Sequence, residues 1–384
     1  MTRITRIGIV TWFYFANPGT AFQAYALQHY LNKCVPNCEA EVLSPYNAFL
    51  YMRNARIFKY YAKDFVKEKC NSLPSLFVFL TRKLYRAFLS IKAFRFCSFQ
   101  RKTILKYPSR TMSVPLSDED CFLINNRYDW VVLGSDQIWN FKISSIRWLD
   151  YFLLSFVKGP LKGAYAPSLS QEGWPEDYKG RIRDLLVDFS FIGVREKQSV
   201  GVVQPLTNVL VHWSLDPVFL LHKTDWDRIA KKPKYKGDYV FEYCIIKSSK
   251  LRAVTEKLAR ETGLPIIEHH GDIRKHIASA KRMPHPSADT WLGYLMNAKF
   301  VVTDSFHGSA FCIITNKDFF TVVTSNGARI YSLLEVFNLQ SRVLTELDEL
   351  DHSAAIAWET VNRLLEERRK DSQDWLKASL NLEE

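Results

Sequence analysis

Short runs of apolar residues alternate with helical patterns along most of this chain. The runs RIGIVTWF, YDWVVLG, DYVFEYCII and AKFVVTDS carry apolar side chains at successive positions, so both faces of each strand must be covered by other elements. The stretch SKLRAVTEKLARETGLP is typical of a helix that ends at Gly263, with Pro265 just beyond. This alternation predicts an α/β protein whose parallel sheets are covered by helices.

The chain length and the spacing of these runs predict two domains. A chain of 384 residues is long enough to bury two hydrophobic cores. We expect a break near residue 190, which gives an N-terminal α/β domain over 1–190 and a C-terminal α/β domain over 191–348. A long amphipathic C-terminal helix is expected over 349–384. Both domains are predicted to be Rossmann-like, so ligands should bind beyond the carboxyl ends of the strands.

The net charge of +12 is concentrated in one segment. Over 51–110, fifteen Lys and Arg accompany two acids, and aromatic residues are interleaved with them. This pattern fits basic helices that pack their aromatic side chains inward. It also fits peripheral contact with an anionic membrane surface. Nucleic acid is the least favoured partner, and we expect none.

Several functional classes are disfavoured by what the sequence lacks. No apolar run reaches the roughly 18 residues of a membrane-spanning helix. The start of the chain, IGIVTWFYFA after Arg3 and Arg6, resembles a signal peptide, but its pattern favours a buried strand. We therefore expect a cytoplasmic protein. It would lie at the inner face of the membrane if 51–110 binds lipid. No P-loop and no G-x-S-x-G occurs. The seven scattered cysteines predict reduced thiols, and neither they nor His269-His270 have zinc-site spacing, so no metal is expected.

Four polar motifs follow predicted strands, where parallel sheets place their ligands. They are Asn17-Pro18-Gly19-Thr20, Gly134-Ser135-Asp136-Gln137, Arg195-Glu196 and Ser305-Phe306-His307-Gly308. Four motifs at equivalent positions predict one shared cleft between two domains.

The last motif has the clearest chemical logic. Gly308 lets a ligand approach the main chain, and Ser305 and Ser309 flank it. The helix SAFCIIT begins directly afterwards and presents free N–H groups to an anion. Beside an anion, the imidazole of His307 can donate a proton near neutral pH. The alternative is a capping histidine with a structural hydrogen bond.

Arginine and carboxylate side chains supply further candidates. Arg195 could bind a carboxylate or phosphate at two points, or it could pair with Glu196 to tie two loops together. Asp136 could accept protons from sugar hydroxyls or cap the following turn. Arg329 opens the helix RIYSLL after a glycine and is a further candidate for anion binding.

The first two motifs could bind a polyhydroxylated ligand. Asn17 and Gln23 carry amides suited to sugar hydroxyls, although Asn before Pro-Gly is also a common turn. We count Gly19 and Ser135 with them as substrate-binding candidates.

Five stretches in order resemble the polysaccharide pyruvyl transferase family. They are NPGTAFQAYALQ, DWVVLGSDQIWN, FIGVREKQS, SLDPVFLL and NAKFVVTDSFHGSAFCIITNKDFFTV. The resemblance spans residues 7 to about 343 and is loosest over 51–110. It implies a GT-B-like pair of domains, with the acceptor on the N-terminal side, the donor on the C-terminal side and the site between them.

The resemblance also implies a reaction. Phosphoenolpyruvate is the donor, and a pyruvate ketal is formed on two hydroxyls of a hexose in a cell-surface polysaccharide precursor, lipid-linked or free. No cofactor or metal is implied beyond this co-substrate. The family's functional histidine matches His307, which is expected to act as acid or phosphate partner. The family's arginine matches Arg195, which is expected to bind the donor. Asp136 then faces the acceptor as a hydrogen-bond acceptor or base.

This chain departs from the family pattern at two positions. Some members carry an Arg where Ser305 stands here, so Arg329 is expected to compensate. Pro18 stands where an aromatic residue is usual, which leaves acceptor recognition open. Two other functions fit the same cleft: a GT-B-type glycosyltransferase with a nucleotide-sugar donor, and a non-catalytic protein that binds anionic saccharides. The sequence does not indicate the oligomeric state.

Overall fold

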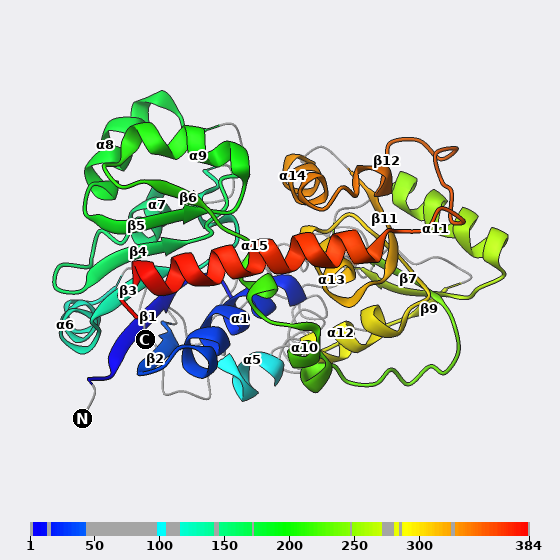
Figure 1. Ribbon diagram of the computed structural model, residues 1–384, viewed down its shortest axis with the longest axis horizontal. Coiled ribbons are helices and arrows are strands. Elements are labelled where there is room, and N and C mark those ends of the chain that lie inside the picture. Colours follow the sequence, from blue (N-terminus) through cyan, green and yellow to red (C-terminus); the bar gives the residue numbers. More distant parts are fainter. Residues whose placement is uncertain are drawn as a thin grey trace, which may run out of the picture.

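The computed structural model describes residues 3–13, 17–43, 98–104, 116–141, 146–170, 173–245, 248–270, 280–283, 286–323 and 327–382. These residues form two six-stranded parallel sheets, each covered by helices (Figure 1). The predicted α/β class with two parallel-sheet domains is therefore confirmed.

The first sheet has the strand order β2-β1-β3-β4-β5-β6. Its strands are β1 (Thr5–Val10), β2 (Cys38–Val42), β3 (Trp130–Leu133), β4 (Leu161–Tyr165), β5 (Phe189–Val194) and β6 (Val211–Trp213). The helices of this part of the chain are α1 (Pro18–Cys34), α5 (Ser98–Lys102), α6 (Asp118–Arg127), η2 (Gln137–Trp139), α7 (Ile146–Phe152), α8 (Glu176–Leu186), α9 (Lys197–Val203) and η3 (Gln204–Leu206).

The second sheet has the order β12-β11-β10-β7-β8-β9. Its strands are β7 (Val240–Cys244), β8 (Ile266–His270), β9 (Lys281–Arg282), β10 (Phe300–Thr303), β11 (Asp318–Val322) and β12 (Val343–Leu344). The helices from the crossing between the sheets onward are η4 (Pro217–Leu220), α10 (Lys223–Ile229), α11 (Ser249–Thr262), α12 (Ala288–Asn297), α13 (Phe306–Thr315), α14 (Ala328–Val336), η5 (Gln340–Arg342) and α15 (Trp358–Ser379).

The boundary between the two halves differs from the predicted one. Residue 190 falls inside β5, which pairs with β4, and β6 also belongs to the first sheet. The chain crosses to the second sheet only between β6 and β7, so Arg195 lies in the first half. A strand that is apolar on both faces looks the same whichever sheet it joins, so the alternation carried no signal for this boundary.

The two halves share one hydrophobic core. Phe22 of α1 contacts Trp226 of α10 and Phe311 of α13, with ring centroids 5.3 and 5.1 Å apart. Trp226 and Phe311 are themselves 4.9 Å apart. These buried rings join a helix of the first half to helices of the second, so the halves are packed together and not merely linked.

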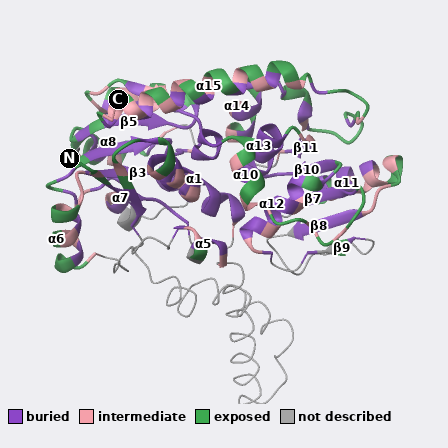
Figure 2. Ribbon diagram, turned by 60° about the horizontal axis from the view of Figure 1, so that its bottom comes forward, coloured by how far each residue is buried: buried purple, intermediate pink, exposed green. Residues whose placement is uncertain are grey.

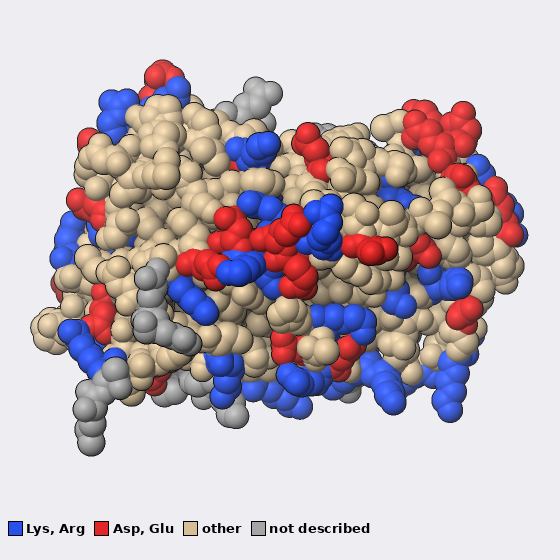
Figure 3. Space-filling model, viewed as in Figure 1, with Lys and Arg blue, Asp and Glu red and all other residues tan. Residues whose placement is uncertain are grey.

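Helix α15 crosses back over both halves (Figure 1). Its buried residues recur at helical spacing, namely Val361, Leu365, Arg369, Ser372 and Leu376. Its exposed face carries mixed charges, including the pairs Arg363–Glu367 and Lys370–Asp374 (Figure 3). The predicted C-terminal helix over 349–384 is present, but it begins at Trp358 and ends at Ser379.

Most of the basic segment 51–110 lies outside the residues that the structure describes. Residues outside the described ranges are grey in Figure 2. Its predicted contact with a membrane therefore stays a prediction. Within the described ranges, no helix combines the length and apolar character needed to cross a bilayer.

Candidate functional site

His307 lies in the first turn of α13, directly beyond the carboxyl end of β10. Ser305 is the N-cap of this helix, and its hydroxyl accepts a hydrogen bond of 3.2 Å from the backbone N–H of Gly308. The capping bond fixes the first turn, and the His307 side chain is buried there with 5% of the residue exposed. Its Nε2 atom is 3.5 Å from a carboxylate oxygen of Asp216. The imidazole thus faces a fixed anion from the other half of the chain.

Arg195 follows β5 and is almost completely buried. Its Nη1 donates to Asp216 at 2.8 Å, and its Nε donates to Glu196 at 3.3 Å. The guanidinium also lies over the ring of Phe306, with 4.3 Å between Cζ and the ring centroid. Among the described residues, its Nη2 has no hydrogen-bond partner. Arg195 therefore does pair with Glu196, which the sequence had left open. Within the described residues, this pairing leaves the Nη2 donor of Arg195 without a partner.

Asp216 is a central residue that the sequence analysis did not single out. It follows β6 and caps η4, where its Oδ1 accepts from the backbone N–H of Val218 at 3.1 Å. Its Oδ2 accepts from Arg195 and, at 2.9 Å, from the hydroxyl of Ser135. The signal was present in SLDPVFLL, one of the stretches that carry the family resemblance. An Asp before Pro, however, reads equally well as a turn.

The electrostatics of this cluster keep its groups charged. Burial alone would raise the pKa of Asp216, but His307 and Arg195 outweigh burial and hold the pKa well below its usual range. Burial likewise opposes the charged form of Arg195, yet Glu196, Asp216 and Asp136 together raise its pKa. The site is therefore a buried network of ions in which each charge depends on its partners.

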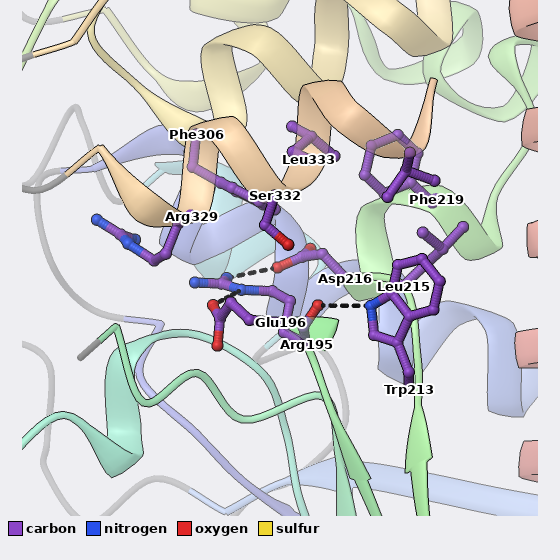
Figure 4. A pocket seen from close by; sticks show the side chains of 11 residues that line it. Arg195, Glu196, Trp213, Leu215, Asp216, Phe219, Phe306, Arg329, Ser332 and Leu333 are labelled. Atoms are coloured by element: carbon purple, nitrogen blue, oxygen red, sulfur yellow. Dashed lines mark hydrogen bonds and ion pairs between the residues drawn. The ribbon is translucent and has the colours of Figure 1, made fainter. Parts of the chain in front are cut away.

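Arg329 lies in the first turn of α14 and lines the same pocket as Arg195 (Figure 4). Burial, followed by the nearby charge of Arg195, lowers the pKa of Arg329 to about 10. In the amide orientation that satisfies its neighbours, Gln137 accepts from Arg329 Nη1 at 3.1 Å. The structure thus brings Arg329 to the site, bonded across the two halves.

The pocket itself combines a charged rim with an apolar wall (Figure 4). Its volume is about 300 Å³, counted together with the solvent at its opening. The residues that line it are Arg195, Glu196, Trp213, Leu215, Asp216, Phe219, Phe306, Arg329, Ser332, Leu333 and Val336. Two guanidinium groups on one pocket suit an anionic ligand.

Asp136 has a strained backbone and occupied oxygens. Its φ of 76° is in the left-handed region, which is uncommon for a residue with a side chain. One carboxylate oxygen accepts from the Thr20 hydroxyl at 2.7 Å, and the other accepts from the backbone N–H of Gln137 at 2.7 Å. Asp136 therefore joins the β3 exit to α1, and its predicted role as base stays a prediction.

The candidates on α1 lie at its N-terminus or just behind it. Asn17 is the N-cap, and its side-chain oxygen accepts from Gly19 at 3.0 Å and from the Tyr243 hydroxyl at 3.4 Å. A Cβ on Gly19 would lie 2.3 Å from the ring of His307, so only glycine fits there. Gln23 is buried, and its amide nitrogen donates to three groups at the end of β1 and the start of α1. Asn17 and Gly19 border the site, whereas Gln23 holds the loop in place.

The remaining candidates serve internal packing. Ser309 is fully buried, and its hydroxyl bonds to the Ser305 carbonyl and to Thr321. A Cβ on Gly308 would lie 2.6 Å from the Thr303 hydroxyl. Ser135 bonds to Asp216 and to the carbonyl of Ala166. These residues shape the site, and their predicted contact with substrate stays a prediction.

Metal and thiol chemistry have few candidates in this region. In the part of the chain that the structure describes, no three His, Cys, Asp or Glu side chains are grouped so as to hold a metal ion. Among the described residues, Cys34, Cys38, Cys121 and Cys312 are free thiols.

The fold and the site together define a two-domain α/β protein with a pocket between its halves that is lined by two arginines. A model of the polysaccharide pyruvyl transferase family matches residues 17–326. The chain therefore belongs to the polysaccharide pyruvyl transferase family. No curated protein matches it.

Several solved structures have a similar fold. A co-structure of Staphylococcus aureus MnaA with UDP is 11% identical with a TM-score of 0.52, covering 99% of this chain and 98% of that one. A putative UDP-N-acetylglucosamine 2-epimerase from Listeria monocytogenes is 9% identical with a TM-score of 0.50, covering 97% and 91%. A Thermobaculum terrenum O-GlcNAc transferase is 13% identical with a TM-score of 0.48, covering 99% and 66%. At these identities the likeness to the first two structures concerns the fold alone, and it agrees with the predicted two-domain, GT-B-like arrangement.

Proposed function

We propose that the protein transfers a pyruvyl group from phosphoenolpyruvate to two hydroxyls of a hexose in a cell-surface polysaccharide precursor. The two hydroxyl oxygens bond to C2 of the donor, the bond from C2 to the phosphate oxygen breaks, and inorganic phosphate leaves. One hydroxyl proton is gained overall by the methylene carbon, which becomes a methyl group, and the other leaves with the phosphate. Donor and product have the same oxidation level, so this proposal includes no redox cofactor.

The observation that carries the proposal is the convergence of three basic side chains near one pocket. Arg195 and Arg329 line it, and His307 contacts the Asp216 carboxylate that borders it. Among the described residues, Arg195 Nη2 and Arg329 Nε lack hydrogen-bond partners. A donor with one carboxylate and one phosphate would satisfy both and relieve the repulsion between the two guanidinium groups.

The proposed roles follow from the chemistry of each group. The two arginines bind the carboxylate and the phosphate of the donor. His307 supplies the proton that the donor gains, since an imidazole is the side chain that changes charge near neutral pH. The hexose approaches from the first half, beside Asn17 and Asp136.

The test is incubation of the purified protein with phosphoenolpyruvate and a series of hexosides, starting with β-galactosides. We expect phosphate release that depends on the acceptor, and a product heavier by one pyruvate less one water. Release of a nucleotide from a nucleotide sugar, without pyruvylation, would instead indicate a glycosyltransferase. A shift in thermal stability with anionic saccharides and no turnover with either donor would indicate a binding protein.

Replacement of the imidazole tests the assignment within this reaction. We expect His307→Ala to lower kcat by about a hundredfold or more, because general acid catalysis contributes roughly 10² to 10⁴. The control is His352, a partly exposed residue that pairs with Glu261, and His352→Ala should keep full activity. A His307→Ala protein that melts like the wild type and turns over at the wild-type rate would remove His307 from the mechanism.

A further inference from the structure

The carboxylate of Asp216 makes more contacts than the capping of a helix requires. Capping uses only Oδ1, which bonds to Val218. Oδ2 faces three groups from three other segments: Arg195 Nη1 at 2.8 Å, Ser135 Oγ at 2.9 Å and His307 Nε2 at 3.5 Å. A structural cap would not need this second set of contacts.

The surroundings of Asp216 define how its charge acts. Its side chain is completely buried, as is the guanidinium of Arg195, so water does not screen their interaction. The other charged groups of this cluster are Glu196 beyond β5, Asp136 beyond β3 and Arg329 on α14. They interact with Arg195 and with one another. The first turn of α1, at Asn17, Pro18 and Gly19, contributes no charged group. Asp216 is therefore the anion that directly faces His307.

The opposite edge of the imidazole has a different environment. A Cβ on Gly19 would lie 2.3 Å from both Cγ and Nδ1 of His307, so this edge rests against the first turn of α1. Nε2 faces the ionised carboxylate of Asp216 at 3.5 Å and, among the described residues, has no hydrogen-bond partner. An ionised carboxylate favours the tautomer that places the proton on the nitrogen facing it.

We infer that Asp216 is a positioning residue, which keeps a proton on Nε2 of His307 and orients Arg195 toward the donor. This inference rests on the proposed function.

The kinetic test is Asp216→Asn, which keeps the size of the side chain and removes its charge. We expect kcat to fall about a hundredfold. The basic limb of the pH–rate profile should move to lower pH, because the imidazolium loses an anionic neighbour while Arg195 and Arg329 remain. Asp188→Asn is the matched control, since Asp188 is 59% exposed and lies away from the site. A fall in kcat with an unmoved profile would overturn the inference.

A spectroscopic test does not depend on turnover. The ¹⁵N chemical shifts of His307, assigned by comparison with His307→Gln, should show the proton on Nε2 in the neutral ring of the wild-type protein. The Nδ1–H tautomer would overturn the inference, even if Asp216→Asn failed to fold. If the wild type consumed no phosphoenolpyruvate but showed the Nε2–H tautomer, the proposed function would fail while the pairing of Asp216 with His307 would stand.

Discussion

At the scale of single residues, Arg195 has a structural role and a proposed binding role, and an alanine substitution would not distinguish them. It binds Asp216 and Glu196, which are both buried, and it presents a free Nη2 to the pocket. Removing it leaves two buried carboxylates without their cation, which costs about 3–5 kcal/mol in comparable cases. Loss of activity in Arg195→Ala would therefore report unfolding as much as lost donor binding.

Arg195→Lys separates the two tasks. It keeps the positive charge, so we expect the free energy of unfolding to fall by less than about 2 kcal/mol, whereas the planar fork is lost. The KM for phosphoenolpyruvate should rise roughly ten- to a hundredfold, the value of one or two charge-assisted hydrogen bonds. The measurements are donor titrations and chemical denaturation of both proteins. An unchanged KM would show that Arg195 is purely structural.

The sequence allowed some of these residues to be predicted and others not. His307 and Arg195 were found because each follows an apolar strand, where a parallel sheet places its ligands. Asp216 was missed because its importance comes from contacts with Arg195, Ser135 and His307, which are distant in sequence. Gln23 and Ser309 were also predicted to bind substrate. Their hydrogen bonds in the structure are made within the protein, and their contact with substrate stays a prediction.

At the scale of elements, the site depends on the first turn of α1 lying against the first turn of α13. Asn17 and Pro18 start α1, Ser305 starts α13, and Gly19 allows the His307 ring to pack against the α1 backbone. The strand–helix alternation predicted both helices, because each needs only a cap and an apolar stripe. It did not predict their contact, which depends on how the two halves pack.

Gly19→Ala tests this contact between helices. The added methyl would lie 2.3 Å from the His307 ring, so the ring must move. Displacement of a catalytic group by about 1 Å can cost about a hundredfold in rate, and we expect kcat to fall by at least that factor. Gly201→Ala in α9 is the control: nothing lies within 4 Å of its added Cβ, so activity should be unchanged. Equal activity of both variants would contradict the observed packing.

At the scale of the whole molecule, three features join the halves: the shared aromatic core, the crossing from β6 to β7, and α15. Helix α15 is bonded to the crossing itself, since Arg369 donates to the carbonyl of Phe219 and Gln373 to that of Leu220. Its Trp375 stacks on His212 at 4.5 Å. The last helix thus braces the segment that carries Asp216.

This connectivity predicts how the protein unfolds. We expect one cooperative calorimetric transition for both halves, because neither can lose its packing without exposing the shared core. Phosphoenolpyruvate at about a hundred times its Kd should add about 2.7 kcal/mol to the free energy of unfolding. The temperature of the single transition should rise for both halves together. Scanning calorimetry with and without the donor makes the measurement. Two separate transitions, of which the donor moves only one, would contradict it.

The position of Asp216 at the crossing between the sheets has a consequence for motion. If the halves swing apart to exchange substrates, they pivot near η4 and the stretch of α15 bonded to it, and atoms close to a pivot are displaced least. The edges of the pocket far from this pivot would then move most, while the contacts of Asp216 with Arg195 and Ser135 would change least.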